Sequence, residues 1–224
     1  MCSDSRCFSL RNWLKDGNAL GFDFIFKDIP NELLPFDYDS YNKYPGILQV
    51  GTTDIRSGKS IWFGKEAATK FAFEPVRASS SLPFISHIVT IGSHPLLDGA
   101  ILNPIPYQRA LRAGYKKFVF VLTRNKGYEK NSSVPRIILK TWYKDYPKLW
   151  DIMEQRPKKY NELLKDIEKM EQTGQAVIIR PDTPLALNRL DMNPDKLLEL
   201  HDHGIGCGLE AYAKIMELYQ RKIE

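Results

Sequence analysis

The sequence predicts an α/β fold that continues into a mostly helical C-terminal segment. Three observations support this fold class. The run Phe118–Leu122 is apolar at every position, which is typical of a parallel strand covered on both faces. A helix predicted for Ile105–Ala113 leads directly into that run, as in an α/β unit. After Tyr128, apolar residues recur at helical spacing, which indicates amphipathic helices.

The N-terminal part begins with a dense apolar cluster formed by Phe22, Phe24, Ile25, Phe26 and Ile29. Two interpretations of this cluster remain open. Aromatic clusters usually pack, which favours a core helix. A contiguous apolar surface is also typical of an interaction site, which here would be a lipid-facing lid.

A helix and a hairpin are predicted next. Phe36–Tyr44 reads as a short helix ended by a Pro-Gly step. Ile47–Asp54 and Ser60–Phe63 read as two antiparallel strands joined by a tight turn. The turn segment Ser57–Ser60 has the Gly-Lys-Ser order that ends a phosphate-binding loop. Its first glycine is misplaced and no helix follows, so we interpret it as a hairpin turn.

A second hairpin is predicted for His87–Ile91 and His94–Asp98, turning at Gly92. The residues Ser79–Ser81 precede it. A serine is a poor nucleophile unless a base lies within hydrogen-bond reach and a strained elbow exposes it. We therefore interpret these serines as close-packing residues of a small-residue helix.

The helix Ile105–Ala113 has recognisable signals at both ends. Asn103 is predicted as its N-cap, with Pro104 in the first turn. Gly114 follows the last helical residue, where a left-handed conformation usually ends a helix.

We place a domain boundary near residue 141. Residues 1–141 are predicted to form the α/β domain, and residues 142–224 a helical C-terminal extension with one short strand. No internal repeat or low-complexity linker separates the two parts.

The extension has a clear order of elements. Helices broken near Pro147 are followed by a short strand at Ala176–Ile179. Asn193 is predicted to cap a further helix that ends at Gly204. The last helix is predicted for Gly208–Lys222, with the intervening glycines as a flexible joint.

Composition excludes several classes of protein. No apolar run approaches the ~18 residues of a spanning helix, and the start of the chain has no signal-peptide core. The formal net charge is +5, but charges of both signs are interspersed, so no nucleic-acid partner is expected. The three cysteines show no metal-type spacing and no even framework. These features indicate a cytoplasmic protein, with peripheral contact to a membrane surface as the expected relation to lipid.

No metal and no cofactor is expected. His201, Asp202 and His203 look like metal ligands, but residues two apart on a helix point to different sides. A zinc site needs ligands that converge. The nearby glycines at 204, 206 and 208 lack the preceding strand and the spacing of a dinucleotide-binding fingerprint.

Asp98 is the candidate catalytic residue. It ends an apolar run and is followed by Gly99 and Ala100. A glycine lets the backbone turn sharply and lets another group approach closely. We therefore expect Asp98 to project from a strand end at the rim of the sheet, where α/β folds place their ligands.

The order of motifs around Asp98 resembles the patatin-like phospholipase family, in particular its bacterial group with an added C-terminal segment. The residues that carry the resemblance are Ala78–Phe84, Asp98-Gly99-Ala100 and Asn103–Pro106, with support from Gly51–Asp54, Ser57-Gly58 and Ile178–Leu190. The resemblance covers most of the chain. It implies a three-layer α/β/α sheet that is incomplete at its N-terminal side.

The resemblance also implies an activity. Members of this family are lipid acyl hydrolases that degrade lipid esters with a Ser-Asp dyad and no histidine. Asp98 matches the general base of the dyad, and Gly99 and Ala100 match the motif that aims it. The nucleophilic serine lies in a Gly-x-Ser-x-Gly elbow in the family, and no such motif occurs in these 224 residues. We expect that elbow and the Gly-rich oxyanion loop to lie N-terminal to Met1.

Two functions follow from this reading. The chain is either the part of a serine esterase or phospholipase that carries the dyad acid, with little activity alone, or a non-catalytic patatin-like remnant that binds lipid or a protein partner. A sheet that lacks its first strands has an unprotected edge. We therefore also expect self-association of the chain through that edge.

Overall fold

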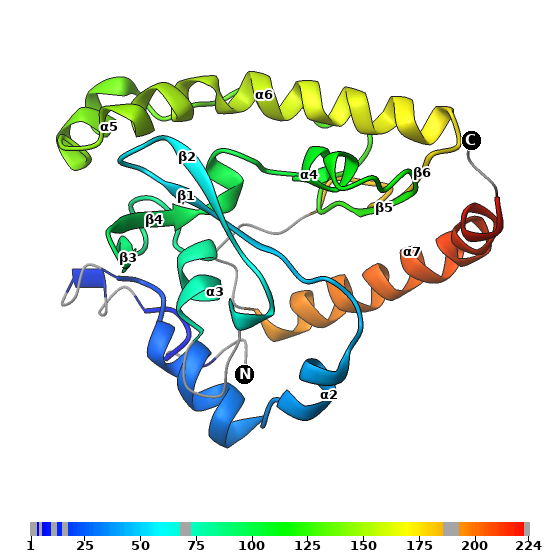
Figure 1. Cartoon of the computed structure of the whole chain (residues 1–224), viewed down its shortest axis with the longest axis horizontal. Helices are drawn as coiled ribbons and strands as arrows, with labels where there is room; N and C mark the ends of the chain where they lie inside the picture. The colour runs from blue at the N-terminus through cyan, green and yellow to red at the C-terminus, as the bar shows by residue number, and fades with distance from the viewer. Residues whose placement is uncertain are drawn as a thin grey trace. The chain divides into compact units, whose positions relative to one another are not determined.

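The computed structural model of the chain describes residues 4, 6–9, 13–14, 18–67, 73–185 and 193–221. It is a mixed α/β protein, which confirms the predicted fold class at this level (Figure 1). The chain forms two compact units that alternate along the sequence. The first contains Ser3–Pro104 and Ser133–Arg156, and the second contains Ile105–Ser132 and Pro157–Glu224. Because the units are interleaved, they do not test the boundary near residue 141, which stays a prediction.

The first unit contains a four-stranded antiparallel sheet with the order β2-β1-β4-β3. Its strands are β1 (Val50–Asp54), β2 (Lys59–Phe63), β3 (Val89–Ile91) and β4 (His94–Asp98). Both predicted hairpins are confirmed, although β1 begins at Val50 and not at Ile47. Gly58 and Gly92 take φ angles of 70° and 60° in the two turns, a conformation that glycine adopts without strain.

Both faces of this sheet are covered. Leu96 and Leu97 are adjacent on β4, so their side chains point to opposite faces, and each is 0% exposed. Leu96 packs with Ala78 of α3 (Glu74–Ser79). Leu97 packs with residues of α5 (Arg136–Trp142) and of the first part of α6 (Pro147–Gln172).

The N-terminal segment of this unit is built from short helices. They are η1 (Phe24–Leu33), α2 (Tyr38–Lys43) and the 3-10 turn η2 (Lys65–Ala67). The helix predicted for residues 36–44 is confirmed as α2, with Asp37 as its N-cap. The helix η1 is a π-helix. In the apolar cluster, Phe22 and Phe24 are buried, in agreement with the core interpretation, whereas Phe26 is half-buried.

The second unit contains a two-stranded parallel sheet, β5 (Phe118–Val121) and β6 (Ala176–Ile179). The predicted parallel strand is therefore confirmed. One face of β5 is apolar and packed against α4 (Tyr107–Arg112) and the second part of α6, through Tyr107, Phe118, Phe120, Leu163 and Ile167.

The expectation that β5 is covered on both faces was wrong. Val119 and Val121 point to the opposite face from Phe118 and Phe120, and they are 46% and 73% exposed. On β6, by contrast, Val177 packs with Ala211 and Leu218 of α7 (Pro194–Gln220). Within this unit, the strand formed by the apolar run at 118–122 is therefore covered on one face and exposed on the other.

Two helix boundaries also differ from the prediction. The helix α7 runs without a break from Pro194 to Gln220, so Gly204 does not end it. Asn193 caps α7 as predicted, since its side chain accepts hydrogen bonds from the N–H groups of Asp195 and Lys196. Asn103 does not cap α4; its side-chain amide donates to the hydroxyl of Ser60 on β2.

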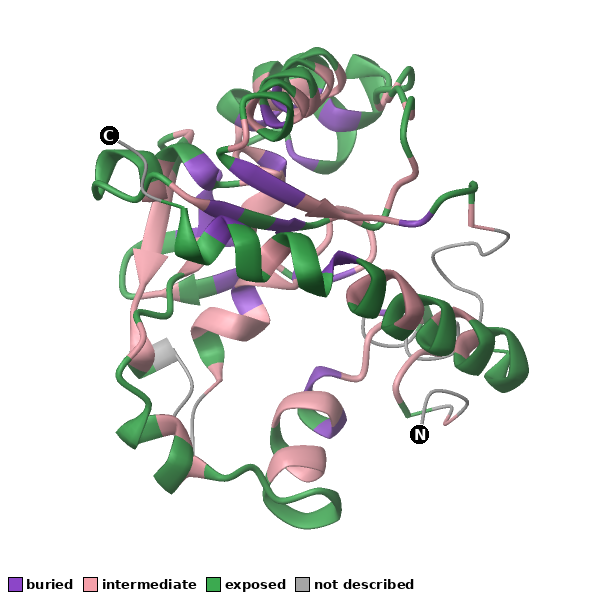
Figure 2. Cartoon of the chain, turned by 90° about the vertical axis from the view of Figure 1, so that its right-hand side faces the viewer, coloured by how far each residue is buried: buried purple, intermediate pink, exposed green. Residues whose placement is uncertain are grey.

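The elements differ in how far their residues are buried. Figure 2 shows buried residues on strands and on some helical turns, and α7 is exposed over most of its length. No helix within the described ranges is long and apolar enough to cross a membrane.

Candidate functional site

Asp98 is the last residue of β4, and its main chain is held from two sides. Its N–H donates to the carbonyl of Ser81, 2.9 Å away, and its own carbonyl accepts from the hydroxyl of Thr53 at 2.9 Å. In the sheet Asp98 lies opposite Thr52 of β1. The residue is half-buried. The backbone at Asp98 is therefore positioned by β1 and by the segment after α3.

The Asp98 side chain caps the turn that follows. The turn η3 (Gly99–Ile101) begins there, and the Asp98 carboxylate accepts the N–H of Ala100 at 2.7 Å. Arg156 of α6 donates from Nε to the Ala100 carbonyl at 3.1 Å. Because both the N–H and the carbonyl of Ala100 are engaged, the turn that the Asp98 carboxylate caps is held in place by the protein itself.

Gly99 is needed because another strand approaches it. A Cβ atom at this position would lie 2.2 Å from the carbonyl oxygen of Gly51 and 2.6 Å from its carbonyl carbon. The close approach expected at Gly99 is confirmed. The residue does not adopt a left-handed conformation, so the glycine is required by packing against β1 and not by its own backbone angles.

The hydroxyl groups around this turn are already used as donors. Four of them donate to main-chain carbonyls: Ser79 to Gly51, Ser81 to Arg77, Thr52 to Ile61 and Thr53 to Asp98, at 2.8–3.0 Å. A hydroxyl has one proton to donate. None of these four groups is therefore arranged to give its proton to the Asp98 carboxylate, and the packing role predicted for Ser79 and Ser81 agrees with their contacts.

The structure also contains a carboxylate–histidine pair that sequence reasoning missed. Asp54, at the end of β1, is buried, and its Oδ2 lies 2.9 Å from Nδ1 of His94 on β4. Its Oδ1 accepts from the N–H groups of Arg56 and Ser57 in the following turn. An Asp at the first position of a turn is a sequence signal for this cap. The partnership with His94 has no such signal, because it depends on how two hairpins are aligned.

The electrostatics of Asp54 follow from these contacts. Burial raises the pKa of Asp54, but the hydrogen bonds from His94, Ser57 and Arg56 outweigh burial and hold the pKa below its ordinary value. The carboxylate is therefore ionised at neutral pH and stabilises the turn. His94, the first residue of the inner strand β4, is oriented by it.

The histidines of α7 do not converge on a common point. His201 contacts Asp202 beside it, and His203 lies 3.6 Å from the sulfur of Cys207, one turn further along. Across the part of the chain that the structure describes, no three His, Cys, Asp or Glu side chains are grouped so as to hold a metal ion.

Comparison with known proteins concerns only the C-terminal part of the chain. Residues 146–220 match a family model described as a domain of unknown function, DUF6363. This segment is about a third of the chain and contains α6, β6 and α7 over their whole lengths, but not Asp98. No curated protein matches the chain.

Proposed function

We propose that this chain is the acid-bearing part of a patatin-like lipid acyl hydrolase with a three-layer α/β/α sheet, in which Asp98 is the general base of a Ser-Asp dyad. The observation that carries the proposal is the turn at Asp98. Its carboxylate is held by the Ala100 N–H, its backbone by β1 and the segment after α3, and its neighbour Gly99 by the contact with Gly51. A catalytic base needs this kind of rigid support.

The proposed reaction has two steps. Asp98 accepts the proton of a serine hydroxyl while the serine oxygen attacks the carbonyl carbon of a lipid ester. The alcohol leaves with a proton returned from Asp98, and the acyl group stays on the serine. Water then attacks the acyl-serine and gives a proton to Asp98, and Asp98 passes that proton to the departing serine oxygen as the fatty acid is released, so that both the serine hydroxyl and the carboxylate are restored. Gly99 and Ala100 act by positioning the carboxylate.

The nucleophile in this proposal comes from a segment outside the 224 residues. These residues contain no Gly-x-Ser-x-Gly motif, and the four hydroxyls of Ser79, Ser81, Thr52 and Thr53 donate to main-chain carbonyls. The oxyanion donors would come from a Gly-rich segment in the same way.

The second candidate is a non-catalytic module that binds lipid or a protein partner. The engagement of those same four hydroxyls favours it for this chain on its own. Both candidates keep the Asp98 turn, so only a functional measurement separates them.

The test is the substitution Asp98→Asn in the protein expressed from its whole coding region. An asparagine still accepts the Ala100 N–H, so the melting temperature should change little. It cannot accept the serine proton, so turnover of a short-chain ester should fall by about 10²–10⁴-fold. Asp145→Asn, at an exposed carboxylate elsewhere, is the matched control.

Two outcomes would count against the enzyme. Equal turnover in the wild type and Asp98→Asn would remove Asp98 from the mechanism. If a fluorophosphonate probe, which labels activated serines, leaves the wild-type protein unlabelled, the binding module is the better description.

A further inference from the structure

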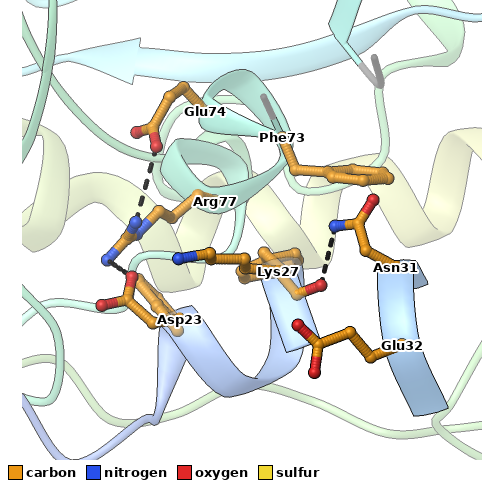
Figure 3. Close-up of a pocket in the computed structure, with 9 residues that line it drawn as sticks. Asp23, Lys27, Asn31, Glu32, Phe73, Glu74 and Arg77 are labelled. Carbon is orange, nitrogen blue, oxygen red and sulfur yellow. Dashed lines mark hydrogen bonds and ion pairs between the residues drawn. The ribbon is translucent and has the colours of Figure 1, made fainter. Parts of the chain in front are cut away.

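A pocket in the first unit lies beside the π-helix η1. It has a volume of about 360 Å³, and the N-terminal part of α3 forms another of its walls. We call it the η1 pocket. Phe22, Phe26 and Phe73 supply its apolar lining, so a ligand there contacts aromatic rings as well as charged groups (Figure 3).

The geometry of η1 explains which residues meet in this pocket. Hydrogen bonds in a π-helix join residue i to residue i+5, so side chains five apart lie on the same side. Lys27 and Glu32 are such a pair, and Phe26 and Asn31 are another. In an α-helix only residues three or four apart share a face, and Glu32 would turn away from Lys27. Long π-helical segments are rare, and π-turns are frequent at functional sites.

The charges of the pocket are of both signs. Arg77 is held by Asp23 at 3.0 Å and by Glu74 at 3.4 Å, with its guanidinium 5.4 Å from the centre of the Phe22 ring. With Lys27 and Glu32, the lining has two positive and three negative side chains. A purely anionic ligand is therefore disfavoured, whereas a ligand with one negative and one positive group is matched.

Two of these charges are available to a ligand. Within the described residues, neither the Lys27 ammonium nor the Glu32 carboxylate has an ion pair or a hydrogen-bond partner. Figure 3 shows Lys27 extending across the pocket toward Arg77, with Glu32 on the next turn of η1. Arg77 is already engaged by two carboxylates, so Lys27 is the cation that is left for an anionic group.

We infer that the η1 pocket binds an ethanolamine phosphodiester, with the phosphate at Lys27 and the primary ammonium at Glu32 and the phenylalanine rings. A Lys ammonium is a common phosphate ligand. A carboxylate accepts the N–H donors of a primary ammonium, and aromatic faces attract cations. A diester carries one negative charge, so the whole group is neutral and suits the lining better than a monoester.

This chemistry occurs in a lipid head group and in a soluble ester. If the ligand is a lipid, the inference rests on the proposed function, because the ethanolamine phosphodiester is then the head group of the hydrolase's substrate. The short helix α3 connects the η1 pocket with the Asp98 turn. Arg77 of α3 lines the pocket, and the carbonyl of Ser81, just beyond the helix, accepts the Asp98 N–H.

The first arm of the test is a chemical-shift titration of the whole chain with glycerophosphoethanolamine. We expect saturable shifts in residues 22–32 and 73–77, with a Kd on the order of 1 mM. Lys27→Gln and Glu32→Gln should each weaken the binding of this ligand about tenfold, because each removes a charged hydrogen bond. The wild-type chain should bind glycerophosphocholine about tenfold more weakly, because its quaternary ammonium has no N–H to donate to Glu32. Lys144→Gln and Glu210→Gln, at exposed positions elsewhere, should bind like the wild type.

The second arm measures co-sedimentation with phosphatidylcholine vesicles, with and without phosphatidylethanolamine. Binding that requires phosphatidylethanolamine and is lost in Lys27→Gln supports a lipid source, and binding of the soluble ester alone supports a free one. Failure of both arms, or equal binding by the variants and the wild type, overturns the inference. Asp98→Asn should bind normally, so a failed hydrolase proposal and a failed pocket give different results.

Discussion

The two sheets of this protein differ in how completely their strands are covered. In the four-stranded sheet, Leu96 and Leu97 point to opposite faces and both are fully buried. In the two-stranded sheet, Phe118 and Phe120 of β5 are buried, whereas Val121 is 73% exposed on the other face. The first sheet is a closed scaffold that holds Asp98 in one position. The second presents an apolar strand face that is free to contact something else.

This difference suggests separate tasks for the two sheets. A rigid scaffold suits a residue that must be aimed, because small displacements remove a proton acceptor from reach. An exposed apolar strand face is typical of an interaction surface. The self-association through an unprotected sheet edge that we expect from the sequence stays a prediction, and the exposed face of β5 is a separate surface.

The largest expected effect compares matched truncations in the two sheets. Leu97→Ala should lower the free energy of unfolding by about 3 kcal/mol, because a buried leucine leaves a cavity. Val121→Ala should change it by less than about 0.5 kcal/mol. Guanidinium denaturation measures both. A large loss in Val121→Ala that depends on protein concentration would mean that a second copy covers β5 in solution.

A smaller effect tests the close packing of β1 against the turn that follows Asp98. Gly99→Ala should destabilise the protein by about 2–3 kcal/mol, because the new Cβ would collide with the main chain of Gly51. Gly206→Ala in α7 is the control, since no atom lies near its Cβ position. That variant should be more stable by about 0.5–1 kcal/mol, through helix propensity alone. Equal effects of the two substitutions in thermal melts would refute the close contact at Gly99.

The smallest effect concerns the acid stability of the first sheet. The pKa of Asp54 is lower in the folded chain than the usual 3.9 or so of an unfolded aspartate. Its stabilisation is therefore present above about pH 4 and is lost as the pH falls through the folded pKa. Asp54→Asn should flatten the decline of unfolding free energy below pH 4. Asp145→Asn should keep the wild-type slope, and an unchanged slope in Asp54→Asn would contradict the assignment.

Local signals in the sequence determined much of the fold. The two hairpins, the parallel strand at Phe118, the Asn193 cap and the amphipathic helices each depend on residues close together in the chain, and all are present. The position of Asp98 at a strand end beside a required glycine was also predictable, because the Asp-Gly step after an apolar run is a local feature.

Only the three-dimensional structure decided the remaining features, and most of them depend on contacts between distant parts of the chain. The approach of Gly51 to Gly99 and the pairing of Asp54 with His94 require the register of β1 against β4. The exposure of Val121 depends on what packs against β5, which its apolar composition cannot specify. Lys27 and Glu32 line the same pocket because η1 is a π-helix, and no residue of η1 is a sequence signal for that conformation.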